Sequence, residues 1–365
     1  MNITINKKKL VESLKTVAGP TSTKQDFLAL GSVLIDVKKN VIKFTTTDLD
    51  VTISTYIKKE IKTPGKVLVP IRRFISIARE LPDSVITLEK LKNILLIRCG
   101  KVEFKINVLK EEEFPKIQEE KEAVSIKILP ETLEEMIRLT SFCVGYEDVN
   151  YILSGVLFEL EKNKIKLVAT DGKRLSFISR EFPKNQAEVE EKISFILPSK
   201  AVGEIARLTK EKQNPLYLSF SEKNIEFDFQ ETKVIARPIE GGFPNYSQYI
   251  PKKRGDCLKV DRETFIASLR RISLLTTQEY QGVKLNLKKN KMVIYKTTPQ
   301  LGEAKEEINI EYQGAGLDIE FNPNYFIDIL KQINDQKVMI DFFGAEKPAV
   351  IKRENHTYLL LPMKT

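Results

Sequence analysis

The sequence predicts an α+β protein of three similar domains, each made of two strand-helix-strands units. The chain has 365 residues, which is more than one core of ordinary size accommodates. A segment that begins with a short alternating strand and passes into an amphipathic helix occurs three times. A strand followed by proline and a second helix also recurs at a nearly constant interval.

The three opening segments each contain a helix with one apolar stripe. They span Asn2–Ile57, Val124–Ile178 and Leu258–Ile310. Apolar residues recur at helical spacing, which predicts that one face of each helix is buried. These residues are Leu10, Val11, Leu14 and Val17 in the first segment, Leu133, Met136 and Ile137 in the second, and Phe265, Ile266, Leu269 and Ile272 in the third.

Strands with period-two alternation follow each of these helices. They begin near Gly31, Gly155 and Gly282, and a second strand follows each within a few residues. An asparagine stands between the two strands in every copy, at Asn40, Asn163 and Asn290. Asparagine is favoured in tight turns, so three hairpins are predicted.

Three prolines mark the starts of the second helix in each domain. Pro198 follows Pro70 by 128 residues, and Pro323 follows Pro198 by 125 residues. Proline is tolerated in the first helical turn because that position needs no N–H donor. The related segments Glu113–Ile117 and Gly242–Tyr246 close the first two copies. The predicted domains are therefore residues 1–120, 121–253 and 254–365.

Six similar units in series either stack openly or curve toward closure. Open sheet edges favour aggregation, and head-to-tail pairing of edge strands between two chains removes them. The repeat therefore favours a dimeric ring of two three-domain chains.

Composition excludes several functional classes. Lys and Arg total 59 against 50 Asp and Glu, a formal charge of +9 that is compatible with a polyanionic partner but also with an ordinary lysine-rich surface. His356 is the single histidine, so a histidine-based catalytic site or common zinc site is not expected. Cys99, Cys143 and Cys257 lie far apart, which predicts reduced, buried thiols and a cytoplasmic protein.

Targeting and nucleotide-binding signals are missing from the sequence. No apolar run is long enough to cross a membrane, and residues 1–10 contain no signal-peptide core, so a soluble protein is expected. No Gly-x-x-x-x-Gly-Lys-Ser/Thr loop occurs, so ATP-driven steps would require another protein. No cofactor and no metal site are predicted.

Two alternative functions remain at this point. A metal-dependent phosphoesterase would use acidic residues such as Asp48, Asp50 and Asp171, but Asp48 and Asp171 occupy equivalent positions in separate repeats and are not expected to converge. The other alternative is a scaffold, or a transcription-associated DNA-binding protein, built from the same repeat without a closed ring.

The repeat, together with five motifs, resembles the β subunit of bacterial DNA polymerase III, the β sliding clamp family, over essentially the whole chain. The motifs are Thr47-Asp-Leu-Asp, Val168-Ala-Thr-Asp-Gly-Lys-Arg-Leu, Phe243-Pro-Asn-Tyr-Ser-Gln-Tyr-Ile-Pro-Lys, Phe321-Asn-Pro-Asn-Tyr and Leu360-Leu-Pro-Met-Lys-Thr. The resemblance implies the DNA clamp fold in a head-to-tail dimeric ring, with helices inside and sheets outside. It implies a non-catalytic processivity factor that encircles duplex DNA without reading its sequence.

A sliding protein offers diffuse positive charge to phosphates, because specific base contacts would hold it at one site. The expected DNA-facing residues are Arg72, Arg73, Arg79, Lys200, Arg207, Arg270 and Arg271, and the resemblance adds Lys24 and Tyr151. Lysines at positions 7–9, 15 and 210 add charge to the same helices. The third helix is an exception because it carries Glu131, Glu134 and Glu135.

The resemblance also implies a pocket between the second and third domains that binds short motifs of the type Gln-Leu-x-Leu-Phe. Its partners would be the polymerase III α subunit, the clamp loader and other proteins that carry such motifs. Arg174 is expected to anchor a polar end of the partner, and Gly172 to let its backbone approach. The matching residues are Leu153, Thr170, Gly172, Lys173, Arg174, Leu175, Pro244, Gln248, Tyr249, Leu359, Leu361, Pro362, Met363 and Lys364.

Two of these positions depart from the family pattern, which often has His at Lys173 and frequently a basic residue at Gln248. The Thr170–Lys173 segment is also explained by a tight turn alone, because Asp and Gly favour turns. The segment from Leu359 to Met363 is likewise compatible with a last core strand.

Overall fold

The computed structural model describes residues 1–21, 28–117, 124–145, 151–181, 189–221 and 223–363. These residues form six α-helices and 25 β-strands, as expected for an α+β fold of six repeated units. They belong to two compact units. The first comprises Met1–Leu133 and Lys200–Pro238, and the second comprises Glu134–Lys184, Glu188–Ser199 and Ile239–Thr365.

The helices confirm the predicted apolar stripes, except that Val11 is only half-buried and lines a groove. Leu10, Leu14 and Val17 are buried in the first helix, and Phe265 and Leu269 are buried in the fifth. Asparagine or aspartate precedes three helices and accepts a backbone hydrogen bond from the first turn, which fixes where each begins. The helices are α1 (Lys7–Val17), α2 (Ile71–Glu80), α3 (Pro130–Arg138), α4 (Ser199–Glu211), α5 (Arg262–Ser273) and α6 (Pro323–Gln332).

The three prolines do mark helix starts, but only Pro323 lies inside its helix, at the first position. Pro70 and Pro198 are the last residues of strands and directly precede α2 and α4. Both arrangements suit proline, because neither position has to donate to a helical hydrogen bond.

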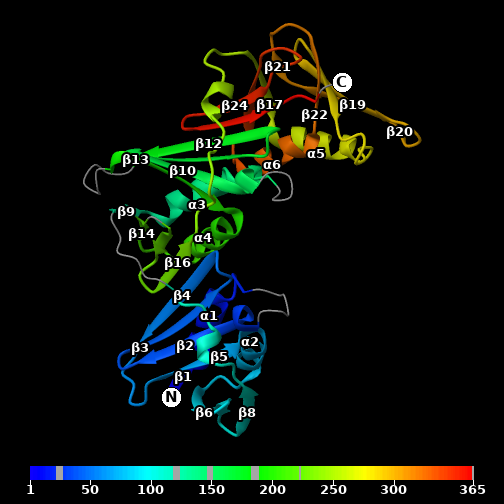
Figure 1. Cartoon of the computed structure of the whole chain (residues 1–365). Helices are drawn as coiled ribbons and strands as arrows, with labels where there is room; N and C mark the ends of the chain where they lie inside the picture. Colours follow the sequence, from blue (N-terminus) through cyan, green and yellow to red (C-terminus); the bar gives the residue numbers. More distant parts are fainter. Residues whose placement is uncertain (22–27, 118–123, 146–150, 182–188, 222, 364–365) are drawn as a thin grey trace. The chain divides into compact units, whose positions relative to one another are not determined.

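The first unit contains two antiparallel sheets, and α1 and α2 lie side by side against the larger one (Figure 1). The eight-stranded sheet has the order β5-β2-β3-β4-β16-β15-β14-β9. Its strands are β2 (Ser32–Lys38), β3 (Val41–Thr47), β4 (Val51–Lys58), β5 (Gly65–Pro70), β9 (Val124–Ile128), β14 (Leu216–Phe220), β15 (Ile225–Asp228) and β16 (Thr232–Ala236). The four-stranded sheet has the order β1-β6-β7-β8, formed by β1 (Asn2–Asn6), β6 (Val85–Leu91), β7 (Ile94–Cys99) and β8 (Val102–Asn107).

The second unit has a corresponding pair of sheets, with α5 and α6 packed against each other. The nine-stranded sheet has the order β13-β10-β11-β12-β25-β24-β23-β17-β21, and the four-stranded sheet has the order β20-β19-β18-β22. The larger sheet comprises β10 (Gly155–Lys162), β11 (Lys164–Thr170), β12 (Arg174–Glu181), β13 (Val189–Pro198), β17 (Asp256–Asp261), β21 (Glu311–Tyr312), β23 (Lys337–Phe342), β24 (Ala349–Arg353) and β25 (His356–Leu360). The smaller one comprises β18 (Val283–Lys288), β19 (Lys291–Thr298), β20 (Gly302–Asn309) and β22 (Leu317–Phe321).

Both large sheets contain strands from two of the predicted domains. Strand β4 pairs with β16 from Val51 opposite Ala236 to Thr55 opposite Thr232. Strand β12 pairs with β25 from Arg174 opposite Leu360 to Ile178 opposite His356. Continuous antiparallel ladders therefore join residues on either side of each predicted domain boundary.

The predicted hairpin turns form at all three asparagines, which separate β2 from β3, β10 from β11 and β18 from β19. Asn290 has a φ of 58°, a left-handed conformation that asparagine tolerates better than most residues.

All three cysteines are free, and the prediction that they are buried is wrong for Cys257. Cys99 and Cys143 are buried, whereas Cys257 is exposed. On β17 the inward positions are Leu258 and Val260, so strand alternation turns Cys257 toward solvent.

Candidate functional site

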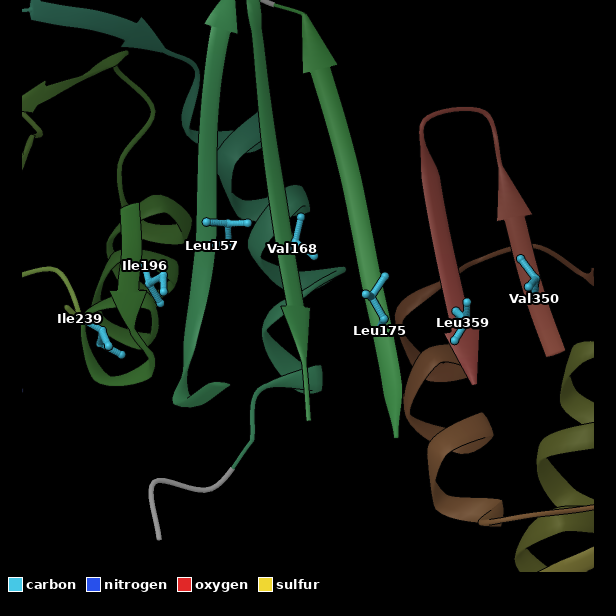
Figure 2. Packing of buried hydrophobic residues seen from close by; sticks show 7 residues of the cluster. All are labelled: Leu157, Val168, Leu175, Ile196, Ile239, Val350 and Leu359. Carbon is cyan, nitrogen blue, oxygen red and sulfur yellow. The ribbon is translucent and has the colours of Figure 1, made fainter. Parts of the chain in front are cut away.

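An apolar row crosses one face of the nine-stranded sheet, and it includes two of the residues predicted for the partner pocket (Figure 2). Strand register aligns these side chains: Leu157 is opposite Val168 and Ile196, and Leu175 is opposite Leu359. The row comprises Ile239, Ile196, Leu157, Val168, Leu175, Leu359 and Val350, all of them buried. Of the residues predicted for the pocket, Leu175 and Leu359 thus belong to this buried row, which we call the floor.

Further apolar side chains pack against this row and are only partly buried. They are Ile152, Phe177, Phe243, Tyr246 and Phe343, none of which was assigned to the pocket from the sequence. Phe243 and Tyr246 do lie in the motif at residues 243–252, so the signal for two of the five was present. The other three come from separate elements and are brought together only by the fold.

The segment before the third predicted domain is fastened to the same sheet face. The Ile239 N–H donates to the Ile196 carbonyl at 2.8 Å. The Tyr246 hydroxyl donates to Glu159 at 2.6 Å, and its ring stacks on Phe177 with centroids 5.8 Å apart. Burial, together with the bond to Glu159, raises the pKa of Tyr246 well above its ordinary value. Pro244, Gln248 and Tyr249, which the sequence assigned to the pocket, are exposed on this fastened segment.

The Thr170–Arg174 segment is a hydrogen-bonded turn. The Asp171 carboxylate accepts from the N–H groups of Lys173 and Arg174 at 2.9 and 3.0 Å. The Thr170 hydroxyl donates to the Arg174 carbonyl at 2.6 Å and accepts from the Gly172 N–H at 3.1 Å. Gly172 has a φ of 84° and open space beside its Cα, so glycine suits both the backbone and the approach of another chain.

The C-terminal segment runs from the last strand onto this turn. Leu359 is buried, while Leu361 and Met363 are 38% and 37% exposed. The Leu361 N–H donates to the Lys173 carbonyl at 2.9 Å, and the Met363 N–H donates to the Glu320 carbonyl at 2.8 Å. The segment is therefore both a core strand and an exposed apolar edge, with Pro362 half-buried between the two exposed residues. Lys364 lies outside the described residues.

Arg174 has a different environment from the one expected of a free anchor. Its three guanidinium nitrogens donate to the Asp171 carboxylate at 3.0 Å, the Asp328 carboxylate at 2.6 Å and the Phe142 carbonyl at 2.7 Å. The guanidinium also lies 4.4 Å from the centroid of the Tyr325 ring. The neighbouring pocket residues Leu153 and Lys173 are half-buried and exposed, respectively.

A basic groove of about 650 Å³ lies among α1, α2 and α4 in the first unit. Its lining includes two of the residues expected to face DNA, Arg79 and Arg207. The cationic side chains are Lys7, Lys8, Lys15, Arg79, Arg207 and Lys212, against the acidic Glu12, Asp83 and Glu211. The excess of positive charge suits a polyanion without providing base-specific geometry.

Not all predicted DNA-facing cations are equally available. Lys200 pairs with Asp48, Arg207 with Glu204 and Glu211, and Arg271 with Glu306. Arg72, Arg73, Arg79 and Arg270 are exposed and have no ion pair within the described residues. Tyr151 is 58% exposed, and Lys24 lies outside the described part of the chain.

The acidic third helix is partly neutralised by nearby arginines. Arg138 lies 3.8 Å from Glu134, and Arg180 donates twice to Glu135, at 3.1 and 2.8 Å. These pairs reduce the negative field of α3. Helical spacing indicates the Arg138–Glu134 pair, but the sequence alone could not show the Arg180–Glu135 pair because Arg180 lies on β12.

The carboxylates of the rival phosphoesterase hypothesis serve as turn residues. Asp48 accepts from the N–H groups of Asp50 and Val51, the same arrangement that Asp171 makes in the second unit. Among the described residues, no three His, Cys, Asp or Glu side chains are grouped closely enough to hold a metal ion.

The chain matches three models that together describe one family. Residues 1–118 match the N-terminal domain of the DNA polymerase III beta subunit, residues 127–245 its central domain and residues 247–364 its C-terminal domain. The beta sliding clamp of Pseudomonas putida is 29% identical over the full length of both chains.

Solved structures agree with these matches. The DNA polymerase III subunit beta of Pseudomonas aeruginosa is 28% identical, covers both chains completely and gives a TM-score of 0.94. A sliding clamp from Bartonella birtlesii bound to griselimycin is 26% identical over both full chains, with a TM-score of 0.95. The fold, the repeat and these matches together show that the chain belongs to the DNA polymerase III beta subunit family, the β sliding clamps.

Proposed function

We propose how this DNA sliding clamp works: two copies close head to tail into a ring around duplex DNA and hold partner proteins there through the pocket of the second unit. Membership of the family makes the chain a non-catalytic processivity factor. The observation that carries the proposed assembly concerns the edges of the two four-stranded sheets. The edge strands β1 and β22 each bond to a neighbouring segment, Asn2 to Thr63 and Glu320 to Met363, whereas the edge strands β8 and β20 make no such backbone bond within the described residues.

Within the described residues, β8 and β20 each have a strand neighbour on one side only. An unpaired edge strand offers backbone donors and acceptors to another chain. Apolar side chains are exposed nearby, with Phe104 on β8 38% exposed and Leu274 after α5 80% exposed. Pairing β8 of one copy with β20 of the next would satisfy both edges and repeat around a closed two-fold ring.

Duplex DNA would be held by charge alone. The basic groove and the exposed arginines of α2 and α5 present cations without a matched set of base-reading groups. Phosphate contacts position a protein on DNA without reading its sequence, so such a ring can slide. Processivity would then come from topological linkage rather than from tight binding.

Partner proteins would dock in the pocket through short apolar motifs. The buried floor at Leu175 and Leu359 and the exposed Leu361 and Met363 provide an apolar surface for such anchors. The polymerase III α subunit, the clamp loader and other proteins with Gln-Leu-x-Leu-Phe motifs are the proposed partners. The related sliding clamp of Bartonella birtlesii binds griselimycin.

The proposal keeps the three domains at residues 1–120, 121–253 and 254–365 and a cytoplasmic location. No helix in the described ranges has the length and apolar character needed to span a membrane.

A retention experiment tests the ring. Protein loaded on nicked circular DNA by a bacterial clamp loader should remain bound in high salt and dissociate once the DNA is linearised, because the linkage is topological. Size-exclusion with light scattering should give about twice 41.9 kDa. Salt-sensitive loss from circular and linear DNA alike, with a monomeric mass, would instead indicate the open DNA-binding scaffold.

A further inference from the structure

The side chain of Arg174 joins three separate parts of the second unit. Its Nε donates to Asp171 in the pocket turn, its Nη1 to Asp328 on α6, and its Nη2 to the carbonyl of Phe142. The turn and Phe142 fall in the second predicted domain, whereas α6 falls in the third. One guanidinium thus connects the pocket turn to an element of the next domain.

This guanidinium is enclosed rather than presented to solvent. The Arg174 side chain is 10% exposed, while its partner Asp328 is 37% exposed. The rings of Tyr325 and Phe142 lie 4.4 and 5.7 Å from it, which places aromatic groups against the cation. A planar group with this many fixed donors is well suited to holding several elements in one geometry.

The turn that Arg174 closes also carries the rest of the pocket. Leu175, the next residue, belongs to the buried floor, and the Lys173 carbonyl accepts from Leu361 of the C-terminal segment. The position of the turn therefore sets the distance between the floor and the exposed edge formed by Leu361 and Met363.

We propose that Arg174 is a positioning residue: it fastens the pocket turn to α6, so that the shape of the pocket, and hence partner affinity, depends on Asp328 outside the pocket. This inference rests on the proposed function of the pocket. It differs from the expectation that Arg174 anchors the polar end of a bound partner, since the geometry points to an internal role.

The two roles make opposite predictions for Asp328. If Arg174 acts through α6, removal of Asp328 loosens the turn and weakens partner binding, and adding that change to Arg174→Ala does little more. If Arg174 contacts the partner directly, removal of Asp328 frees the charge of Arg174 and leaves partner affinity unchanged or improved. The effects of the two substitutions on affinity are then independent.

The experiment uses full-length protein and two fluorescent peptides, Gln-Leu-Ser-Leu-Phe with a C-terminal carboxylate and the same peptide as an amide. By anisotropy, Arg174→Ala should raise Kd about tenfold and Asp328→Ala about fivefold, in line with the loss of a charge-assisted bond. The double variant should lie within about twofold of Arg174→Ala. Arg174→Lys should not restore affinity, because lysine lacks the three-way fork.

Arg180→Ala is the matched control. Arg180 lies on the same strand and donates twice to Glu135 of α3, so its removal breaks a comparable ion pair away from the pocket turn. The Kd of Arg180→Ala for each peptide should stay within about twofold of the wild-type value. The ratio of the acid and amide affinities should also be the same in wild type and Arg174→Ala, because a positioning residue weakens both peptides equally.

Two results would overturn the positioning role while leaving the pocket intact. One is unchanged peptide affinity in Asp328→Ala, and the other is a ratio of acid-peptide to amide-peptide affinity that is lost in Arg174→Ala alone. Leu361→Arg separates the two claims, since Leu361 is an exposed residue of the proposed pocket and its replacement should abolish binding wherever the pocket is correctly assigned. If wild type binds neither peptide, or Leu361→Arg binds them normally, the proposed pocket fails and the role of Arg174 fails with it.

Discussion

His356, the single histidine of the chain, is a buried structural residue. Its Nε2 lies 2.9 Å from the Ser176 hydroxyl, and its Nδ1 is buried with no hydrogen-bond partner among the described residues. Burial, reinforced by the positive charge of Arg353, lowers the pKa of His356 to about 4. The neutral ring therefore persists in the folded chain well below the pH at which a free histidine is protonated.

This environment makes the free energy of unfolding depend on pH. Between pH 6.5 and 4 the unfolded chain takes up a proton at His356 that the folded chain does not, so stability falls as the pH is lowered through this range. The full loss is about 3 kcal/mol by the pKa difference. Urea unfolding at several pH values should show that His356→Gln is less acid-sensitive than wild type by up to this amount. Equal acid sensitivity of the two proteins would contradict the buried, neutral state.

At the level of single residues, the sequence identified positions better than roles. Leu175, Leu359, Leu361 and Met363 were assigned to a partner surface by the family resemblance, and the structure shows the first two buried and the last two exposed; their role in partner binding stays a prediction. The use of Arg174 could not be predicted, because Asp328 is 154 residues away in the sequence and only the fold brings the two together. The sequence likewise did not reveal which basic residues are paired with carboxylates.

The turns after β3 and β11 are built in the same way, but the side chains on the adjoining sheet faces differ in polarity. Thr47 and Asp48 repeat the hydrogen bonds of Thr170 and Asp171, and Leu49 has a φ of 85° where Gly172 has 84°. On the adjoining sheet face, however, the Thr45 and Ser54 hydroxyls are bonded at 3.0 Å, and Thr52 donates to Thr47 at 2.8 Å. By register, Thr45, Thr52 and Ser54 correspond to Val168, Leu175 and Phe177. Three positions that are apolar on the second large sheet are therefore polar on the first.

The helices differ in how much free positive charge they offer, which leads to a prediction for α2 and α5. Arg73 is exposed without an ion pair in the described structure, whereas Arg271 donates to Glu306 at 2.9 and 2.5 Å. Arg73→Ala should weaken binding to a short duplex about twofold to threefold and lower the salt slope by about one. Arg271→Ala should change the duplex affinity and the salt slope less, because the charge of Arg271 is already partly balanced by Glu306.

Fluorescence anisotropy with a labelled duplex at several salt concentrations measures both quantities. Arg98→Ala serves as a control, since Arg98 pairs with Glu103 on a strand rather than on a helix. A larger effect of Arg271→Ala than of Arg73→Ala would show that ion pairing does not determine which cations meet DNA.

Individual elements were largely predictable. Apolar spacing located α1, α3 and α5, proline located α2, α4 and α6, and asparagine located the three hairpins, because all three signals are local. Pro70 and Pro198 were displaced by one residue from their expected place inside the helix, since a proline at the end of a strand signals the same helix start.

For the whole molecule, deletion of the last residues separates assembly from partner binding. Removal of residues 361–365 leaves β25 intact but removes Leu361 and Met363 with their hydrogen bonds to Lys173 and Glu320. Primer-extension assays should show that polymerase stimulation is lost. Light scattering should still give about twice 41.9 kDa, because the proposed chain-to-chain contact uses β8 and β20. Full stimulation by the truncated protein would show that partners dock elsewhere.

The sharing of sheets between predicted domains was not visible in the sequence. Period-two alternation indicates which side chains face the core, but it does not identify the neighbouring strand. Strand β4 pairs with β16 about 180 residues later in the chain, and β12 pairs with β25 at a similar separation. The order of strands in the two large sheets therefore depends on long-range pairing.

The shared sheets also determine where an assembled annulus can be parted. Separating β4 from β16, or β12 from β25, would break an antiparallel ladder of five residue pairs within one chain. It would also expose buried apolar side chains to water. The short sheets that end in β8 and β20 have no such covalent continuity with their proposed counterparts in the second copy. A loading protein that admits DNA would therefore open the assembly at the junction between subunits. The strength of that junction would limit the lifetime of the closed state.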